Sequence, residues 1–155
     1  MHFPIIKLES LETEKADFET SLDYEDSTLN MWTDYYGELY TDSEREKVIK
    51  SNWLKEIFDG VATVDTEKET VTFLDSGTIR QTFREYLLEL TTKLHEEAER
   101  GELRGFELRY ATVEYKEFDA MFYIDCGYTC FELIENAEWH AGETWKIGNI
   151  FDAHF

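Results

Sequence analysis

The spacing of the hydrophobic residues changes along this chain, and that change limits the folds open to it more than any other feature. Several stretches before residue 101 carry an apolar residue every three to four positions, which is the repeat of an amphipathic helix. From Phe106 onward apolar and polar residues alternate, which is the repeat of a half-buried β-strand. The sequence therefore predicts an α+β domain, with N-terminal helices packed on one face of a mostly antiparallel, meandering C-terminal sheet.

Two helical segments are predicted in the first half of the chain. Residues 16–40 carry apolar residues at helical spacing, with a break expected near Ser27, where the sequence favours a new helix start. A second helix is expected over residues 43–59, because Ser43 and Glu46 match the Ser-x-x-Glu pattern of a capping box. The Asp-Gly pair at its end suits a helix C-terminus, since glycine readily adopts the left-handed conformation found there.

A third helix and a series of strands are also predicted. Thr78-x-x-Gln81 can cap a helix that Arg100-Gly101 closes, and one apolar stripe runs along it. Neither an internal repeat nor a domain boundary is visible, so residues 1–155 are expected to form a single domain. The predicted strands cover residues 1–8, 61–64, 70–73, 106–116, 118–124, 128–134 and 144–150.

Charge sets this chain apart from an ordinary domain of its size. Thirty-five Asp and Glu residues face fifteen Lys and Arg residues, which gives a formal net charge of −20. Aromatic residues make up 15% of the chain, so it can bury a core and differs from a disordered acidic tail. Such a surplus of acid disfavours direct binding to nucleic acid and to anionic membranes, and it favours a basic protein surface as the partner.

Seven carboxylates in the first third of the chain recur at spacings that would place them on one side of a helix. Like charges so spaced cost about 0.2–0.5 kcal/mol each, so helix stability does not explain them. Carboxylates one helical turn apart can instead imitate the line of charge on a phosphate backbone. We predict this row as the partner-binding surface, against the alternative of a plain solvated helix face. Its members are Glu19, Asp23, Asp26, Asp34, Glu38, Asp42 and Glu46.

A small, very acidic domain that still carries aromatic residues resembles the DNA-mimic inhibitors that phages and mobile elements use against restriction or CRISPR nucleases. The resemblance lies in size and composition and rests on no motif, so it carries over no functional residue. It implies a stoichiometric inhibitor, monomeric or homodimeric, that occupies a nucleic-acid-binding cleft. An immunity protein or antitoxin that neutralises a nuclease toxin is the alternative, because it relies on the same electrostatics.

Targeting and metal binding find little support in the sequence. The first residues lack the pattern of a signal peptide and no apolar run is long enough to span a membrane, so a cytoplasmic location is expected. Cys126 and Cys130 have the spacing of a zinc-binding pair, but no second pair follows at a finger-like distance. In a strand-rich segment two such cysteines are more often core residues, and no metal or cofactor is expected.

One enzyme hypothesis stands beside the binding hypothesis. Helices followed by a curved sheet that ends in the Trp145-Lys146-Ile147 strand resemble the ketosteroid-isomerase-like cone fold. That resemblance implies a small-molecule pocket, in which acid–base work would fall to Asp119, Tyr110 and His140. Because the cone fold also serves non-enzymes, fold alone does not settle function, and we expect a binding protein rather than an enzyme.

Overall fold

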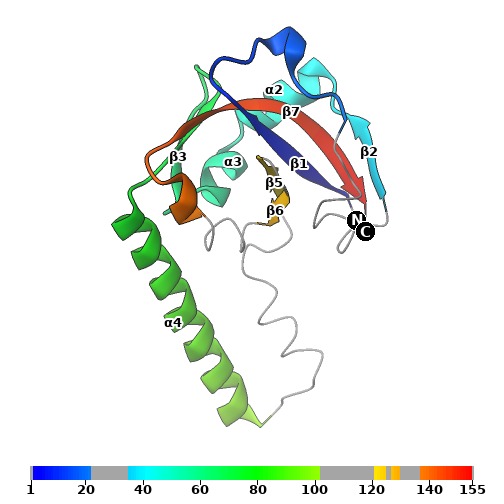
Figure 1. Cartoon of the computed structure of the whole chain (residues 1–155). Coiled ribbons are helices and arrows are strands. Elements are labelled where there is room, and N and C mark those ends of the chain that lie inside the picture. Colours follow the sequence, from blue (N-terminus) through cyan, green and yellow to red (C-terminus); the bar gives the residue numbers. More distant parts are fainter. Residues whose placement is uncertain (1, 22–34, 102–120, 125–126, 130–136, 155) are drawn as a thin grey trace.

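The computed structural model describes residues 2–21, 35–101, 121–124, 127–129 and 137–154 (Figure 1). Residues 22–34 of the helical segment expected over 16–40, the strand expected over 106–116 and the cysteines Cys126 and Cys130 lie outside the described residues.

A mostly antiparallel sheet forms the centre of the molecule. Its order is β3-β4-β7-β1-β5-β6, with β2 pairing against β7 as well, and the described β1–β5 pair is parallel. The two central strands come from opposite ends of the described chain, since β1 pairs antiparallel with β7 from His2↔His154 to Glu9↔Lys146. The strands are β1 (His2–Glu9), β2 (Tyr35–Leu39), β3 (Ala62–Asp65), β4 (Thr70–Phe73), β5 (Met121–Tyr123), β6 (Gly127–Thr129) and β7 (Thr144–His154).

Helices alternate with these strands along the chain. The predicted α+β class and the mostly antiparallel sheet are confirmed. The sheet is not a C-terminal meander, however, because β1 and β2 precede α2 and most neighbouring strands are distant in sequence. The described helical elements are η1 (Lys15–Asp17), α2 (Asp42–Ile49), α3 (Asn52–Ile57), α4 (Ser76–Arg100) and η2 (Ala137–His140), of which η1 and η2 are short 3-10 helices.

The helix predicted over residues 16–40 is wrong where the structure describes it. Only Lys15–Asp17 turn helically, and Tyr35–Leu39 form β2, which pairs with the C-terminal part of β7. The aromatic and apolar residues that suggested a helix are also frequent in strands. Pairing with a strand more than a hundred residues away therefore decides the local conformation.

The predicted helix over residues 43–59 is divided in two, and its start lies two residues earlier. The capping box is made by Thr41 and Glu44, where the Thr41 side chain accepts from the Glu44 amide and the Glu44 carboxylate accepts from the Thr41 amide. The hydrogen bonds lower the pKa of Glu44. After α2 ends, Ser51 caps α3 by accepting from the Leu54 amide, so a second helix starts at once.

The expectations for α4 and for the hairpin before it are largely confirmed. β3 and β4 pair directly, from Ala62↔Phe73 to Asp65↔Thr70. α4 runs to Arg100 and ends on Gly101 in the left-handed conformation, but its N-cap is Asp75 rather than Thr78. The Asp75 carboxylate accepts from the hydroxyl and from the amide of Thr78, and these hydrogen bonds lower its pKa.

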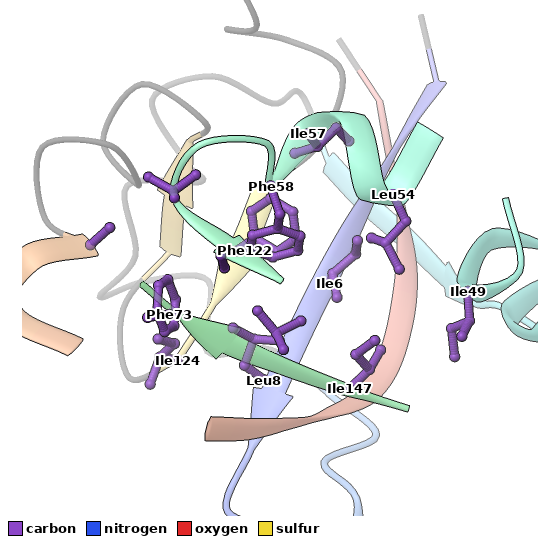
Figure 2. Packing of buried hydrophobic residues seen from close by; sticks show 14 of the residues in the cluster. Ile6, Leu8, Ile49, Leu54, Ile57, Phe58, Phe73, Phe122, Ile124 and Ile147 are labelled. Carbon is purple, nitrogen blue, oxygen red and sulfur yellow. The ribbon is translucent and has the colours of Figure 1, made fainter. Parts of the chain in front are cut away.

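Apolar residues from the sheet and from the three described α-helices share one core (Figure 2). Phe58, which follows α3, lies at its centre, with its ring 4.0 Å from that of Phe122 on β5 and 6.5 Å from that of Phe73 on β4. Other fully buried members come from the central strands and the helices: Ile6, Leu8, Ile49, Leu54, Ile79, Ile147 and Ile150.

Along the edge of β7 that lies opposite β1, two strands pair with different parts of β7, and a gap in the pairing separates them. β4 pairs with residues 144–146 and β2 with residues 151–154. In between, the pairing of β7 with β1 shifts from Ile6↔Ile150 to Leu8↔Ile147, which leaves one extra residue on β7. This is a β-bulge, and because of it two successive carbonyls of β7, those of Ile147 and Gly148, point into the gap between β4 and β2.

Arg45 from α2 fills the gap. Its guanidinium donates to the carbonyls of Ile147 and Gly148, the latter at 2.7 Å, and to the Glu69 carboxylate at 2.7 Å. The side chain is only 3% exposed and lies over the Phe18 ring, with Cζ 5.7 Å from the ring centroid. Because a guanidinium carries five N–H donors in a planar fork, one arginine can satisfy the β7 carbonyls that a neighbouring strand would otherwise pair with.

Gly60 joins α3 to the hairpin in a conformation that favours glycine. Its φ is 76°, and a Cβ placed there would lie 2.7 Å from Oγ1 and Cγ2 of Thr82, whose hydroxyl donates to the Gly60 carbonyl at 2.6 Å. Gly142 has nearly the same φ, 78°, but nothing lies within 4 Å of its Cβ position.

We expect Gly60→Ala to lower the free energy of unfolding by about 1–3 kcal/mol more than Gly142→Ala, because only the first adds a steric clash. Both variants carry the conformational cost of a positive φ, about 1–2 kcal/mol. Urea denaturation of the two variants measures the difference. Equal losses would show that Thr82 moves aside freely.

Candidate functional site

The described members of the predicted acidic row do not lie on one helix. Glu19 follows η1, Glu38 is on β2, and Asp42 and Glu46 are on α2. The other three members, Asp23, Asp26 and Asp34, lie outside the described residues. Of the four described carboxylates, only Asp42 and Glu46 keep the predicted helical spacing, as an i,i+4 pair on α2.

Most of these four carboxylates have a basic neighbour. Glu38 is exposed, whereas each of the other three forms an ion pair with a lysine. The hydrogen bond from its lysine lowers the pKa of Glu46. The local charge of this surface is therefore partly balanced. The three pairs are Lys7–Glu19 at 3.1 Å, Lys15–Asp42 at 3.1 Å and Lys50–Glu46.

A second set of carboxylates does lie along one side of one helix. Glu85, Glu89, Glu96 and Glu99 are all exposed on α4, and we call them the α4 acidic row. At 3.6 residues per turn and 1.5 Å per residue, the row covers about 80° of the helix circumference and about 21 Å of its length. On the other side of the helix Ile79 and Tyr86 are buried and Phe83 is half-buried, whereas Leu87 is 41% exposed.

Among the described residues, one member of the α4 acidic row forms an ion pair with a lysine, against three members of the row predicted from the sequence. The Glu85 carboxylate accepts from the neutral Gln81 amide at 2.6 Å, and Glu99 lies 3.4 Å from His95, which is cationic only when protonated. Lys93 lies 3.4 Å from the Glu89 carboxylate on an exposed part of the helix. Exposed pairs of this kind contribute little and are screened by salt.

An exposed apolar residue borders the row. Leu88 is 58% exposed and lies one turn from Glu85 on the same side of α4. A carboxylate row with an apolar border offers both long-range attraction and some apolar area for contact. The pattern of Glu85, Glu89, Glu96 and Glu99 is readable in the sequence of the predicted third helix. The acids before residue 47 are denser along the sequence and mask this weaker pattern.

A separate polar cluster surrounds η2. Arg80 on α4 pairs with Glu138, with Nε 2.9 Å from Oε2, which lowers the pKa of Glu138 and raises that of Arg80. On the other side of η2, Nδ1 of His140 lies 2.8 Å from the Glu143 carboxylate, which also accepts from the Trp145 indole at 3.1 Å.

His140 is the one described member of the acid–base set that the cone-fold resemblance implies. Asp119 and Tyr110 lie outside the described residues. His140 itself is packed, since its ring centroid lies 5.8 Å from those of Phe73 and Trp145. Its partners thus belong to the junction between β4 and β7.

Metal binding and membrane crossing find no support in the described residues. Within them, no group of three or more His, Cys, Asp or Glu side chains is placed to hold a metal ion. Among the described helices, none combines the length and the apolar character needed to cross a membrane.

Comparison of the sequence with protein-family models and with curated proteins, and of the structure with solved structures, gives no match. Only the residues of this chain and their contacts therefore indicate a function.

Proposed function

We propose that this protein is an acidic inhibitor that binds the basic nucleic-acid-binding cleft of a nuclease or another DNA- or RNA-processing protein. The observation that carries the proposal is the α4 acidic row, four exposed carboxylates on one side of a 25-residue helix in a chain of net charge −20. The inhibitor would be of the anti-restriction or anti-CRISPR type, act in the cytoplasm and need no cofactor.

The position of α4 supports a role in contact with a partner. In Figure 1 the helix extends away from the sheet, and only its first half contributes residues to the buried core. The C-terminal half, which carries Glu96 and Glu99, therefore projects from the rest of the described molecule. A projecting helix can enter a cleft that a flat face cannot reach.

The mechanism we propose is competitive occlusion. Glu85 and Glu89 lie one helical turn apart, as do Glu96 and Glu99, and about 10 Å of helix separates the two pairs. These carboxylates would stand where phosphate groups stand in the natural ligand. Long-range attraction between the negative protein and a positive cleft speeds their encounter, and salt screens that attraction. No bond is made or broken, so the protein acts as a binding partner rather than an enzyme.

Affinity capture from a nuclease-treated bacterial lysate tests this proposal, with elution by a salt gradient and identification by mass spectrometry. We expect a nucleic-acid-binding protein to elute at moderate salt, and duplex DNA to compete with the inhibitor for it. The association rate should fall about tenfold or more between 20 mM and 500 mM salt. A partner that binds DNA and this protein at the same time, or a rate that ignores salt, would contradict occlusion.

A further inference from the structure

Trp139 is the most exposed large hydrophobic side chain in the described part of the chain, with 73% of its surface accessible. It lies on η2, next to residues that are buried or paired. Ala137 is in the core, and Glu138 and His140 each have a side-chain partner. The exposure of Trp139 is therefore not the result of a loose segment.

Backbone contacts also fix η2. The Ala141 amide donates to the Glu138 carbonyl at 3.2 Å, and the Glu143 amide donates to the His140 carbonyl at 2.9 Å. The Gly142 amide donates to the carbonyl of Leu74, at the start of α4, at 3.2 Å. Trp139 is consequently held out from a rigid turn. Tryptophan is one of the residues enriched among the energetic hot spots of protein interfaces, and a side chain that is already held in place loses less conformational entropy on binding.

The charges around η2 indicate what kind of group can cover the indole. Three carboxylates, those of Asp75, Glu138 and Glu143, lie on η2 or on the segments that its loop contacts. The described bases beside them are Arg80, paired with Glu138, and His140, which pairs with Glu143 and is cationic only when protonated. A second copy of this chain would bring its own net charge of −20 and a nucleic acid would bring phosphates, so both would be repelled. A cationic group on another protein fits instead.

We propose that Trp139 anchors the protein on its partner by stacking against an arginine side chain. The inference rests on the proposed function, and it adds the chemistry that the partner must present. Arginine is favoured over lysine because a planar, weakly hydrated guanidinium stacks on an indole face, whereas a compact ammonium keeps its water. Clefts that bind nucleic acid carry such arginines for their bidentate contact with phosphate.

Two peptides of equal charge, deca-arginine and deca-lysine, test this inference by fluorescence titration at low salt. We expect the wild type to bind deca-arginine about fivefold more tightly than deca-lysine. In Trp139→Ala the two affinities should become nearly equal, while Trp139→Phe should keep part of the preference. Leu11→Ala is the matched control, because Leu11 is also exposed, at 49%, on the loop after β1, and it should keep the wild-type preference.

The outcomes separate this inference from the function on which it rests. An arginine preference that survives in Trp139→Ala, or that is absent from the wild type, overturns the role of Trp139 and leaves occlusion standing. Failure of both peptides to bind the wild type contradicts the electrostatic basis of both proposals. If a single-stranded oligonucleotide quenches Trp139 fluorescence instead, the indole stacks on bases and the arginine assignment is wrong.

Discussion

Replacing Arg45 by methionine is expected to lower the free energy of unfolding by about 3–5 kcal/mol. Methionine fills much of the volume but donates no hydrogen bond, so the carbonyls of Ile147 and Gly148 would lose their donor inside the protein. Glu69 would lose its partner as well, although it is 38% exposed and water can replace part of that contact. The main loss therefore lies in the two buried carbonyls.

Lys47→Met is the matched control for this substitution. Lys47 is on the same helix and is exposed, so its replacement should change stability by no more than about 0.5 kcal/mol. Arg45→Lys should fall between the two, because one ammonium keeps the charge but does not reach all three acceptors with the same geometry. Chemical denaturation followed by far-UV circular dichroism gives the three values. A methionine variant as stable as the control would show that β7 does not need the guanidinium.

Reversing the α4 acidic row, by changing Glu85, Glu89, Glu96 and Glu99 to Lys together, is expected to slow association with the captured partner about 100-fold or more at low salt. The change removes four negative charges from one side of the helix and adds four positive ones. It converts attraction into repulsion at the surface that we assign to the interface. Stopped-flow measurement of the association rate tests it, with circular dichroism to verify that α4 remains helical.

A second charge-reversal variant with the same change in net charge distinguishes the α4 acidic row from the row predicted from the sequence. Reversal of Asp23, Asp34, Glu38 and Asp42 to Lys alters net charge equally but acts on the row predicted from the sequence. If association slows mainly in this second variant, the interface lies there and not on α4. If both variants slow it equally, net charge rather than a defined surface governs the encounter.

The sequence predicts well those parts of the fold whose conformation depends on residues close by in the sequence. The β3–β4 hairpin needs two short β-rich runs and a polar turn, and Asp65 supports that turn by accepting from the amides of Glu67 and Lys68. α4 carries its stripe, its cap and its closing Gly101 in one continuous segment. In both cases every contact needed for the prediction lies within about 25 residues.

The parts that escaped prediction are decided by distant pairing. The sequence from Thr41 to Glu46 contains two overlapping capping boxes, one starting at Thr41 and one at Ser43. The structure uses the first, because Tyr40 donates its amide to the Ile150 carbonyl and so fixes where β2 ends and α2 begins. Nothing local distinguishes the two boxes.

Burial of Arg45 could not be read from the sequence either. It stands between Glu44 and Glu46 in a strongly charged stretch, which is typical of a solvated helix face. Its place inside depends on a bulge in a strand about a hundred residues later. The α4 acidic row, in contrast, was available from the sequence, because helix and spacing were both visible.

The pairing of β1 with β7 has a consequence for how the protein is made. His2 is opposite His154, and every β1–β7 contact joins residues separated by more than a hundred positions. Contacts of such high order make folding slow, since a long loop must close before they contribute. During synthesis β1 leaves the ribosome before β7 and stays unpaired with it until β7 has been made. β4 and β2 also lack β7, the strand with which both of them pair, during this time. Throughout that interval the surplus of negative charge keeps nascent chains apart, which protects the unpaired strands from one another.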